Sequence, residues 1–299
     1  MTSRGYLEYA LLGLLALLWG SSYALISIGL TSFPPVTLMA LRVVFATVFL
    51  LAIIRVRRLS LPRDARMWRL LFLQSILNSS GAWTLLAWGQ QYVDSAVASV
   101  LNSTSPVFVF LITAVLALPG APVLHRLAGA LLGVLGIILI VGPGSLSGLG
   151  GELLPQGAIV AGAILYAMAA VNGRHFSELS PFVTAAGTLI CAVVVLVPAS
   201  LIIDHPWLLA PEPEAWLAVL VLGVVCTGIA FLIYFRLIKT LGPMGVASQA
   251  YLRSGIGVLL GVVFLSETIA PATALGIMVA IAGVVLINMP NRSLNKAPA

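Results

Sequence analysis

The stretch Pro34-Pro-Val-Thr-Leu-Met-Ala-Leu-Arg42-Val-Val-Phe-Ala46 places an arginine inside an apolar run that is long enough to cross a lipid bilayer. A second arginine interrupts Gly245-Val-Ala-Ser-Gln-Ala-Tyr-Leu-Arg253-Ser-Gly-Ile-Gly257 in the same way. A cation at mid-membrane costs about 2.5–3.5 kcal/mol on insertion scales, so it persists only where it faces protein or a wet interior. Each arginine is therefore a candidate for meeting an anionic group of a molecule that crosses the membrane.

The composition excludes a water-soluble protein. Of the 299 residues, 61% are hydrophobic and 8% are charged, whereas a soluble domain carries about 25% charged residues. The sequence therefore predicts an integral membrane protein that is all-α. The formal net charge of +6 does not indicate a nucleic-acid partner, because the basic residues do not form a soluble face. Cys191 and Cys226 lie in apolar runs and are expected to be free thiols.

Ten apolar stretches have roughly the 20 residues that a transmembrane helix requires. The connections between them are short and rich in proline and glycine, which leaves no room for a soluble domain. The first stretch is too long for the core of a signal peptide, so it is interpreted as a retained span. The predicted spans are 8–30, 34–54, 69–89, 93–118, 124–143, 153–173, 180–203, 214–235, 243–265 and 271–289.

The basic residues predict the orientation, because lysine and arginine accumulate in cytoplasmic segments. With the N-terminus inside, every lysine and arginine other than Arg42 and Arg253 falls on the cytoplasmic side. The predicted outer side or outer rim holds Asp94, Glu152, Asp204, Glu212, Glu214 and Glu267. A miscounted span would scatter charges onto both sides, so this separation supports both the ten spans and cytoplasmic N- and C-termini.

The two halves of the chain resemble each other, which predicts one five-helix repeat over residues 1–147 and a second over residues 148–299. An odd number of spans in each half forces the second copy to enter the membrane upside down. Inverted repeats around a midplane site are typical of secondary transporters. The aligned pairs are Val97 with Val246, Ser105 with Ser254, Gly129 with Gly276, and Pro143 with Pro290.

Three motifs carry a resemblance to a known family. Trp19-Gly-Ser-Ser-Tyr, followed by Pro34-Pro and Arg42, resembles the opening of the EamA-type transporters of the drug/metabolite transporter superfamily. Tyr234-Phe-Arg-Leu-Ile-Lys-Thr-Leu-Gly-Pro-Met-Gly-Val-Ala-Ser resembles the family's segment between spans eight and nine, and Leu265-Ser-Glu-Thr resembles its closing signature. The resemblance implies ten transmembrane helices in two inverted five-helix repeats, a central cavity, a bacterial plasma membrane, and export of small metabolites, often amino acids.

The chain departs from the family pattern at several positions. Gly255 stands where the family usually has proline in the ninth span, although Pro106 keeps that proline in the fourth. Ala117-Leu-Pro-Gly stands where the family usually has a glutamate, whereas Glu267 retains it in the second half. Pro106, Gly255 and Glu267 are therefore predicted to be structural or gating residues. Arg253 is not expected across the family, which favours a subfamily with its own substrate.

The two intramembrane arginines are predicted to differ in role. Arg253 is about ten residues into its span, hence roughly 15 Å deep. Its guanidinium would bind a substrate carboxylate through a bidentate fork; the alternative is a lock to carbonyls or polar side chains of a neighbouring helix. No carboxylate lies at this depth in the sequence, so an internal ion pair is not available to it. Arg42 belongs to the family pattern whatever the substrate, which favours a structural role that ties helices together.

Further residues are predicted to line a substrate site. Asn102 and Ser103 precede Pro106, which disrupts helical hydrogen bonding, and irregular backbone at membrane depth is tolerated where it lines a cavity. The alternative is a kink whose polar groups are satisfied internally. Gln74, Asn78 and Trp83 roughly share one helix face. Five aromatic residues are deep enough to stack on a ligand or to hold an amine, although core packing is the commoner role for any single one: Trp19, Tyr23, Trp83, Tyr166 and Tyr251.

Several functions are disfavoured. The sequence contains no phosphate-binding loop, no metal-ligand cluster and no nucleophile–base pair, so no enzyme activity, cofactor or metal is expected. The three histidines lie in predicted loops and no acid lies at mid-span, which disfavours tight proton coupling.

The predicted function is a secondary transporter that exports small carboxylate-bearing metabolites, foremost amino acids, by alternating access. Its expected surroundings are the lipid bilayer, with no nucleic-acid partner and with a monomeric or weakly dimeric state. The alternatives are a carrier for a sugar, nucleoside or cationic drug, or a lipid scramblase-like protein.

Overall fold

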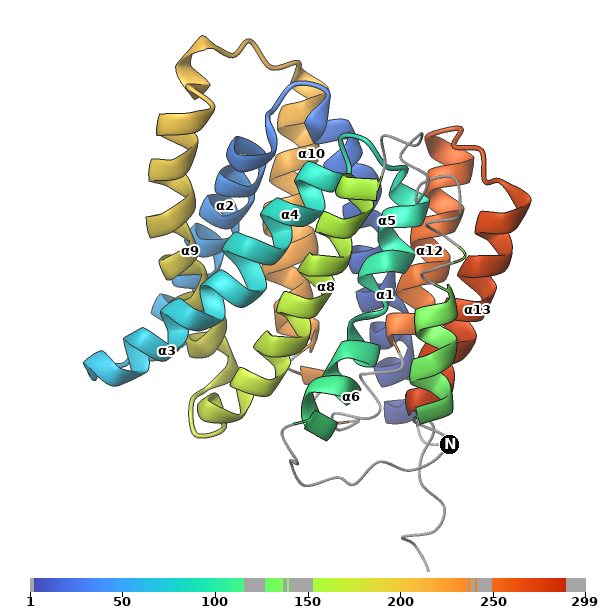
Figure 1. Cartoon of the computed structure of the whole chain (residues 1–299). Coiled ribbons are helices and arrows are strands. Elements are labelled where there is room, and N and C mark those ends of the chain that lie inside the picture. The colour runs from blue at the N-terminus through green and yellow to red at the C-terminus, as the bar shows by residue number, and fades with distance from the viewer. Residues whose placement is uncertain are drawn as a thin grey trace, which may run out of the picture.

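A computed structural model describes residues 3–115, 127–136, 139, 153–234, 236–237, 240 and 249–288. This part of the chain consists of helices and their connections (Figure 1). In the first half the helices are α1 (Ser3–Leu30), α2 (Pro35–Val56), α3 (Ala65–Ser75), η1 (Ile76–Ser80), α4 (Gly81–Gly89), α5 (Ser95–Asn102) and α6 (Ser105–Val115). In the second half they are α8 (Leu153–Asn172), η2 (Gly173–Phe176), α9 (Pro181–Ile203), η3 (Pro206–Leu208), α10 (Pro213–Gly223), η4 (Val224–Ile229), α12 (Gln249–Phe264) and α13 (Pro271–Asn288).

The predicted all-α membrane fold is confirmed. Within the described residues, 7 helical segments are long and apolar enough to cross a membrane. Shorter apolar helices over Leu127–Gly136, Leu252–Phe264 and Ala274–Gly283 correspond to the predicted fifth, ninth and tenth spans. Residues 147 and 148, where the predicted repeats meet, lie outside the described ranges.

Proline marks where many of these helices begin. Pro35, Pro181, Pro213 and Pro271 each stand at the first turn of a helix. The fixed φ of proline suits that position, and its missing N–H would have no intrahelical partner there. Short proline-containing connections therefore end one crossing of the bundle and start the next.

The chain crosses the bundle back and forth, and the second half runs in the opposite sense to the first. In Figure 1, α1 rises from the lower end of the molecule, whereas α8, the first helix of the second half, descends from the upper end. The first residue of α1 and the last residue of α13 lie at the same end of the bundle. This arrangement is what an even number of crossings in two inverted repeats requires.

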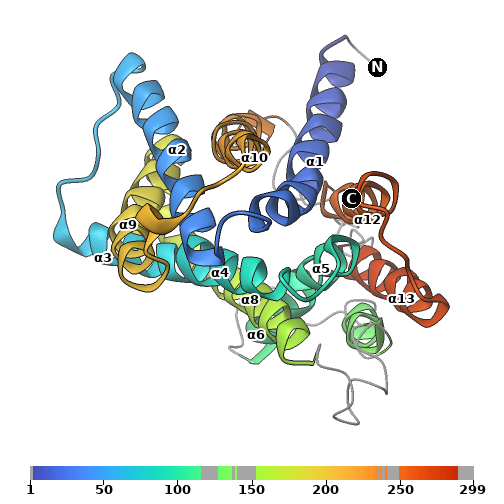
Figure 2. The same cartoon turned by 90° about the horizontal axis from the view of Figure 1, so that it is seen from above.

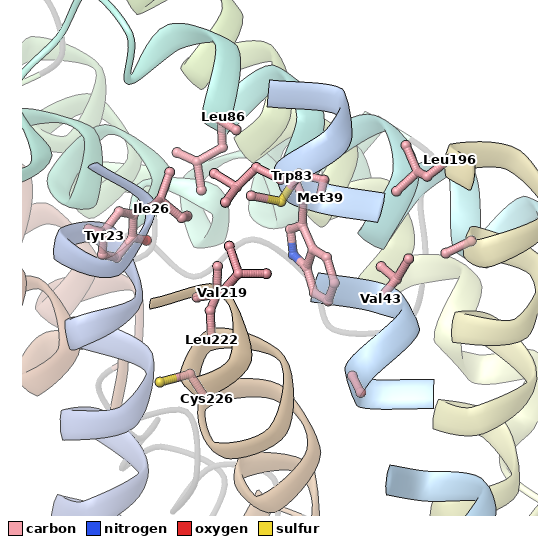
Figure 3. Packing of buried hydrophobic residues seen from close by; sticks show 14 of the residues in the cluster. Tyr23, Ile26, Met39, Val43, Trp83, Leu86, Leu196, Val219, Leu222 and Cys226 are labelled. Atoms are coloured by element: carbon pink, nitrogen blue, oxygen red, sulfur yellow. The ribbon is translucent and has the colours of Figure 1, made fainter. Parts of the chain in front are cut away.

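Helices of one half pack mainly against helices of the other. The extensive pairs are α2 with α9, α1 with α12, and α4 with α8, as the view along the bundle shows (Figure 2). The largest buried apolar cluster draws on both halves, from Tyr23 and Met39 to Leu222 and Cys226 (Figure 3). Cys191 and Cys226 are buried free thiols. The core therefore lies at the interface of the two halves, where a site between repeats would also lie.

In the part of the chain that the structure describes, two transmembrane segments contain a π-helical turn. η1 lies between α3 and α4 in the third span, and η4 follows α10 in the eighth span. π-helical turns interrupt an α-helix with one extra residue and occur frequently at functional sites. The third and eighth spans are equivalent in the predicted repeats, so the same irregularity occurs in corresponding spans of both halves.

Candidate substrate site

Arg42 on α2 is held on two sides inside the bundle. Its Cζ lies 3.8 Å from the centroid of the Trp83 ring on α4, within the range of a cation–π interaction. Its Nε donates a hydrogen bond to Thr227 Oγ1 at 3.0 Å. The Trp83 side chain lies between α2 and α10, close to Val43 and Val219 (Figure 3). Arg42 thus connects three transmembrane segments from both halves of the chain.

The π-helical segment η4 places Thr227 for this contact. The Thr227 hydroxyl donates to the backbone carbonyl of Leu222 at 2.8 Å, which leaves an oxygen lone pair for Arg42. Gly223, four residues earlier, allows the close approach of the two helices. A Cβ at Gly223 would lie 2.9 Å from the carbonyl oxygen of Arg42 and 2.7 Å from Cβ of Phe45. Glycine at this position therefore sets the distance between α10 and α2 beside the arginine.

Asn102 and Tyr23 form a second polar pair. Asn102 Nδ2 donates to Tyr23 Oη at 2.8 Å, between α5 and α1. Asn102 Oδ1 is buried and has no hydrogen-bond partner. Asn102 is the last residue of α5, and α6 begins at Ser105, so the helix break predicted from the Pro106 motif lies at Ser103 and Thr104.

Arg253 on α12 reaches across to the first half of the chain. Its Nη2 donates to Ser103 Oγ at 3.3 Å, a long contact, and its Nε is buried without a partner. Gly20 permits this packing, since a Cβ there would lie 3.0 Å from the carbonyl oxygen of Arg253. Arg236 forms an ion pair with Glu8 at 2.9 Å, whereas neither Arg42 nor Arg253 pairs with a carboxylate among the residues that the structure describes.

Tyr166 on α8 joins these groups into one cluster. Its hydroxyl lies within electrostatic range of both Arg42 and Arg253 and beside the Trp83 side chain. The cluster therefore combines two cations, three aromatic rings and the amide of Asn102 at the interface of the two halves. An assembly of this kind suits an anionic group attached to an apolar or aromatic body.

Three other predicted site residues have their contacts with residues outside this cluster. Gln74 Oε1 accepts from Asn172 Nδ2 at 2.9 Å, and Asn78 Nδ2 donates to Ser79 Oγ at 3.3 Å. Trp19 packs on Phe231 and Tyr234, with ring centroids 6.4 and 5.4 Å away. The role of Gln74, Asn78 and Trp19 as ligand contacts therefore stays a prediction. Each of the three has a packing or hydrogen-bonding partner within the protein.

The predicted structural and gating residues occupy different surroundings. Glu267 caps the N-terminus of α5, where its carboxylate accepts the backbone amides of Ser95 and Ala96. Gly255 lies on the exposed face of α12, with open space where a Cβ would be. The side chains of Pro106 and Tyr251, and all of 117–120, lie outside the described residues.

Sequence reasoning missed Thr227 entirely. It counted Tyr23 and Tyr166 among the aromatic residues deep enough to contact a ligand but did not select them as site residues. The available signal for Thr227 was Cys226-Thr-Gly228, a polar interruption in the apolar eighth span. That signal is weak, because a buried threonine in a membrane helix usually bonds to its own helix.

Comparison with known proteins identifies the family. The profile of the EamA-like transporter family matches residues 7–142 and again residues 155–289. The chain belongs to the EamA-like transporter family. As an EamA-like protein it is a membrane transporter of the drug/metabolite type, as its motifs predicted. The family model matches each half once, and η1 and η4 lie one in each matched stretch.

Relatives within the EamA-like family are distant but cover most of the chain. The chain is 29% identical over 277 residues to the uncharacterized inner membrane transporter YedA of Escherichia coli, covering 92% of this chain and 88% of YedA. It is 26% identical to a probable terminal-alkyne amino-acid exporter of Streptantibioticus cattleyicolor, covering 90% of this chain and 89% of that exporter. A solved crystal structure shares the fold with a TM-score of 0.66 at 22% identity, covering 92% of this chain and 94% of that one.

Proposed function

We propose that this EamA-family transporter exports small carboxylate-bearing metabolites, foremost amino acids, across the bacterial plasma membrane by alternating access. The proposal rests on the two guanidinium groups of Arg42 and Arg253, which lie in transmembrane helices and pair with no carboxylate among the described residues. Uncompensated cations at membrane depth are costly. A cargo that carries a carboxylate supplies the missing negative charge during its passage.

The unsatisfied polar atoms of the cluster match both charged groups of an amino acid. Arg253 Nε is a buried donor without an acceptor, and Asn102 Oδ1 is a buried acceptor without a donor. Each such atom costs about 1–3 kcal/mol when it stays unpaired. A carboxylate would satisfy the arginine and an ammonium group would satisfy the amide oxygen. An α-amino acid carries these two groups on one carbon, and a related exporter is named for amino acids.

The contacts between the halves suit an alternating-access mechanism. Arg253 belongs to the second EamA repeat and Ser103 to the first, so their 3.3 Å hydrogen bond joins the two parts that would move. Rocking of one repeat against the other would break this contact and free Arg253 to follow the cargo. We infer facilitated or exchange transport of an unmodified cargo.

Uptake of labelled amino acids into liposomes that hold the purified protein tests the proposal, with wild type beside Arg253→Ala. Arg66→Ala is a matched control, since Arg66 is exposed at the start of α3. We expect wild type and Arg66→Ala to move several amino acids and Arg253→Ala, correctly folded, to move them more slowly. If wild type moves none, the amino-acid proposal fails, and sugars, nucleosides, cationic drugs and fluorescent lipids form the next panel.

A further inference from the structure

We propose that Arg42, rather than Arg253, makes the first contact with the anionic group of the cargo, and that Thr227 and Trp83 are the residues that position it. This assignment rests on the proposed function in one respect, namely that the cargo carries a carboxylate. It reverses the roles that the sequence favours, because Arg42 matches the general family pattern and was expected to be structural.

The inference rests on the two terminal nitrogens of the Arg42 guanidinium, which keep accessible surface. Arg42 as a whole is 5% exposed, and its Nε is engaged by Thr227. Its two terminal nitrogens have no hydrogen-bond partner among the described residues, yet they are not among the fully buried unpaired atoms. They therefore keep accessible surface inside the protein. The edge that they form presents two parallel N–H groups, which is the geometry that binds a carboxylate in bidentate fashion.

A purely structural arginine would be arranged differently. In a membrane interior, unpaired donors are costly, so a guanidinium that only locks helices together directs its terminal N–H groups at helix carbonyls. Arg42 instead uses one N–H on Thr227 and its flat face on Trp83. Both contacts orient the group while leaving its terminal edge open.

The supporting residues make this orientation rigid. Thr227 is 1% exposed and is itself fixed by the carbonyl of Leu222. Trp83 is 4% exposed and is packed in the main buried cluster beside Tyr166. The guanidinium plane is thus determined by one bond at its Nε side and one ring against its face. A preorganised fork loses less conformational entropy when the anion binds, which raises affinity.

Arg253 presents no comparable open pair of N–H groups in this conformation, although its side chain as a whole is more exposed than that of Arg42. Its Nε is fully buried and its Nη2 is directed at Ser103 of the opposite repeat. A cargo oxygen reaches Arg253 Nε only after the two repeats have moved. Arg42 is therefore the arginine that is ready to bind, and Arg253 is a contact that forms later in the cycle.

Binding of two probes with the same shape and different charge tests the assignment. Phenylacetate carries a carboxylate and phenylacetamide is its neutral analogue. Their affinities for the purified full-length protein in detergent are measured by calorimetry. We expect wild type to prefer phenylacetate by about 10-fold or more, the effect of a charge-assisted hydrogen-bonded pair. We expect Arg42→Gln to lose this preference and Arg253→Gln to keep it.

A second pair of variants separates positioning from general stability. Thr227→Val keeps the shape of the side chain but removes the acceptor of Arg42 Nε, so the preference should fall several-fold with phenylacetamide binding unchanged. Thr47→Val is the matched control, because Thr47 is a buried threonine of α2 whose hydroxyl has no partner. Should Arg42→Gln fail to fold, Arg42→Lys, which keeps the charge but loses the fork, is expected to show a reduced preference.

Retention of the preference by Arg42→Gln, its loss in Arg253→Gln alone, or its absence in wild type would overturn the assignment. Failure of the proposed function looks different. An Arg42-dependent preference for phenylacetate together with no amino-acid uptake would leave the site intact and remove amino acids as cargo. Amino-acid uptake without any Arg42-dependent preference would remove Arg42 and leave the proposed function standing.

Discussion

The carboxylate of Glu267 accepts hydrogen bonds from the backbone amides of Ser95, at 2.8 Å, and Ala96, at 2.9 Å. An acid of the second repeat thus caps the first turn of α5 in the first repeat. The same relationship occurs at α2, where Asp204 accepts from the backbone amide and the hydroxyl of Thr37, both at 2.7 Å. Both contacts lie at the upper end of the bundle in Figure 1, the end opposite to the start of α1. The two halves are therefore joined at this end by charged groups placed on helix N-termini, where negative charge is favourable.

Replacing Glu267 by alanine should loosen this end of the bundle. Loss of the cap is expected to lower the free energy of unfolding by about 0.5–2 kcal/mol. The reactivity of a cysteine placed at the fully buried Ser99 on α5 is expected to rise. Thermal unfolding and labelling by a maleimide measure the two effects, with Glu214→Ala, at an exposed helix start, as the control. Equal labelling of Glu267→Ala and its parent would mean that the cap is not part of a gate.

Cross-linking α2 to α9 should stop transport. The hydroxyls of Thr37 and Ser200 are 2.8 Å apart, so cysteines at both positions are expected to form a disulfide on oxidation. Because the bond joins the two repeats at one end, it holds that end closed and blocks alternating access. Uptake into liposomes should fall on oxidation and return after reduction, whereas Thr37→Cys alone should be insensitive. Full activity of the oxidised double variant would exclude movement of α2 against α9.

Glycine-to-alanine changes at two positions should have opposite effects. Gly223→Ala places a Cβ 2.9 Å from the backbone oxygen of Arg42, so α10 must shift and stability should fall by about 1–3 kcal/mol. Gly255→Ala meets nothing within 4 Å, and alanine is a better helix former than glycine by about 1 kcal/mol, so stability should hold or rise. Thermal unfolding of the two variants checks this, and a stable Gly223→Ala protein would show that the helices are free to adjust.

Asn102→Leu should weaken the binding of ligands that carry an ammonium group and leave the binding of other carboxylates unchanged. Removing the unpaired Oδ1 leaves no acceptor for an ammonium group, while the arginines that meet the carboxylate are unchanged. Binding of phenylalanine should weaken by about 10-fold, the effect of one hydrogen bond to a charged group. Binding of phenylpropionate, which lacks the amine, should be unaffected. A parallel loss for both ligands would point to disruption of the site, and Tyr23→Phe, which keeps the amide, serves as the control.

Local sequence properties predicted the fold class correctly. They did not predict which side chains of the third span lie together. Gln74, Asn78 and Trp83 were predicted to share a face roughly. Gln74 and Trp83 are nine positions apart, which is about two and a half turns of a regular α-helix and places them on opposite sides; the π-helical turn η1 between them changes this phase by one extra residue. Trp83 accordingly joins the Arg42 cluster, whereas Gln74 bonds to Asn172. The turn falls on the polar stretch Asn78-Ser-Ser80, but helical spacing alone does not show an extra residue there.

The sequence by itself determined the membrane class, the ten spans, the repeat and the family, because apolar length, charge placement and motif order are properties of short segments. Only the tertiary structure decided which side chains meet. Arg42 and Thr227 are 185 residues apart in the chain, and Thr37 and Asp204 are 167 apart. Their contacts depend on how two inverted repeats pack and on the close approach that Gly223 allows. The assignment of Arg42 as the first contact for the cargo anion depends on that packing. The burial and the hydrogen bonding of Arg42 are determined by helices that are distant in sequence.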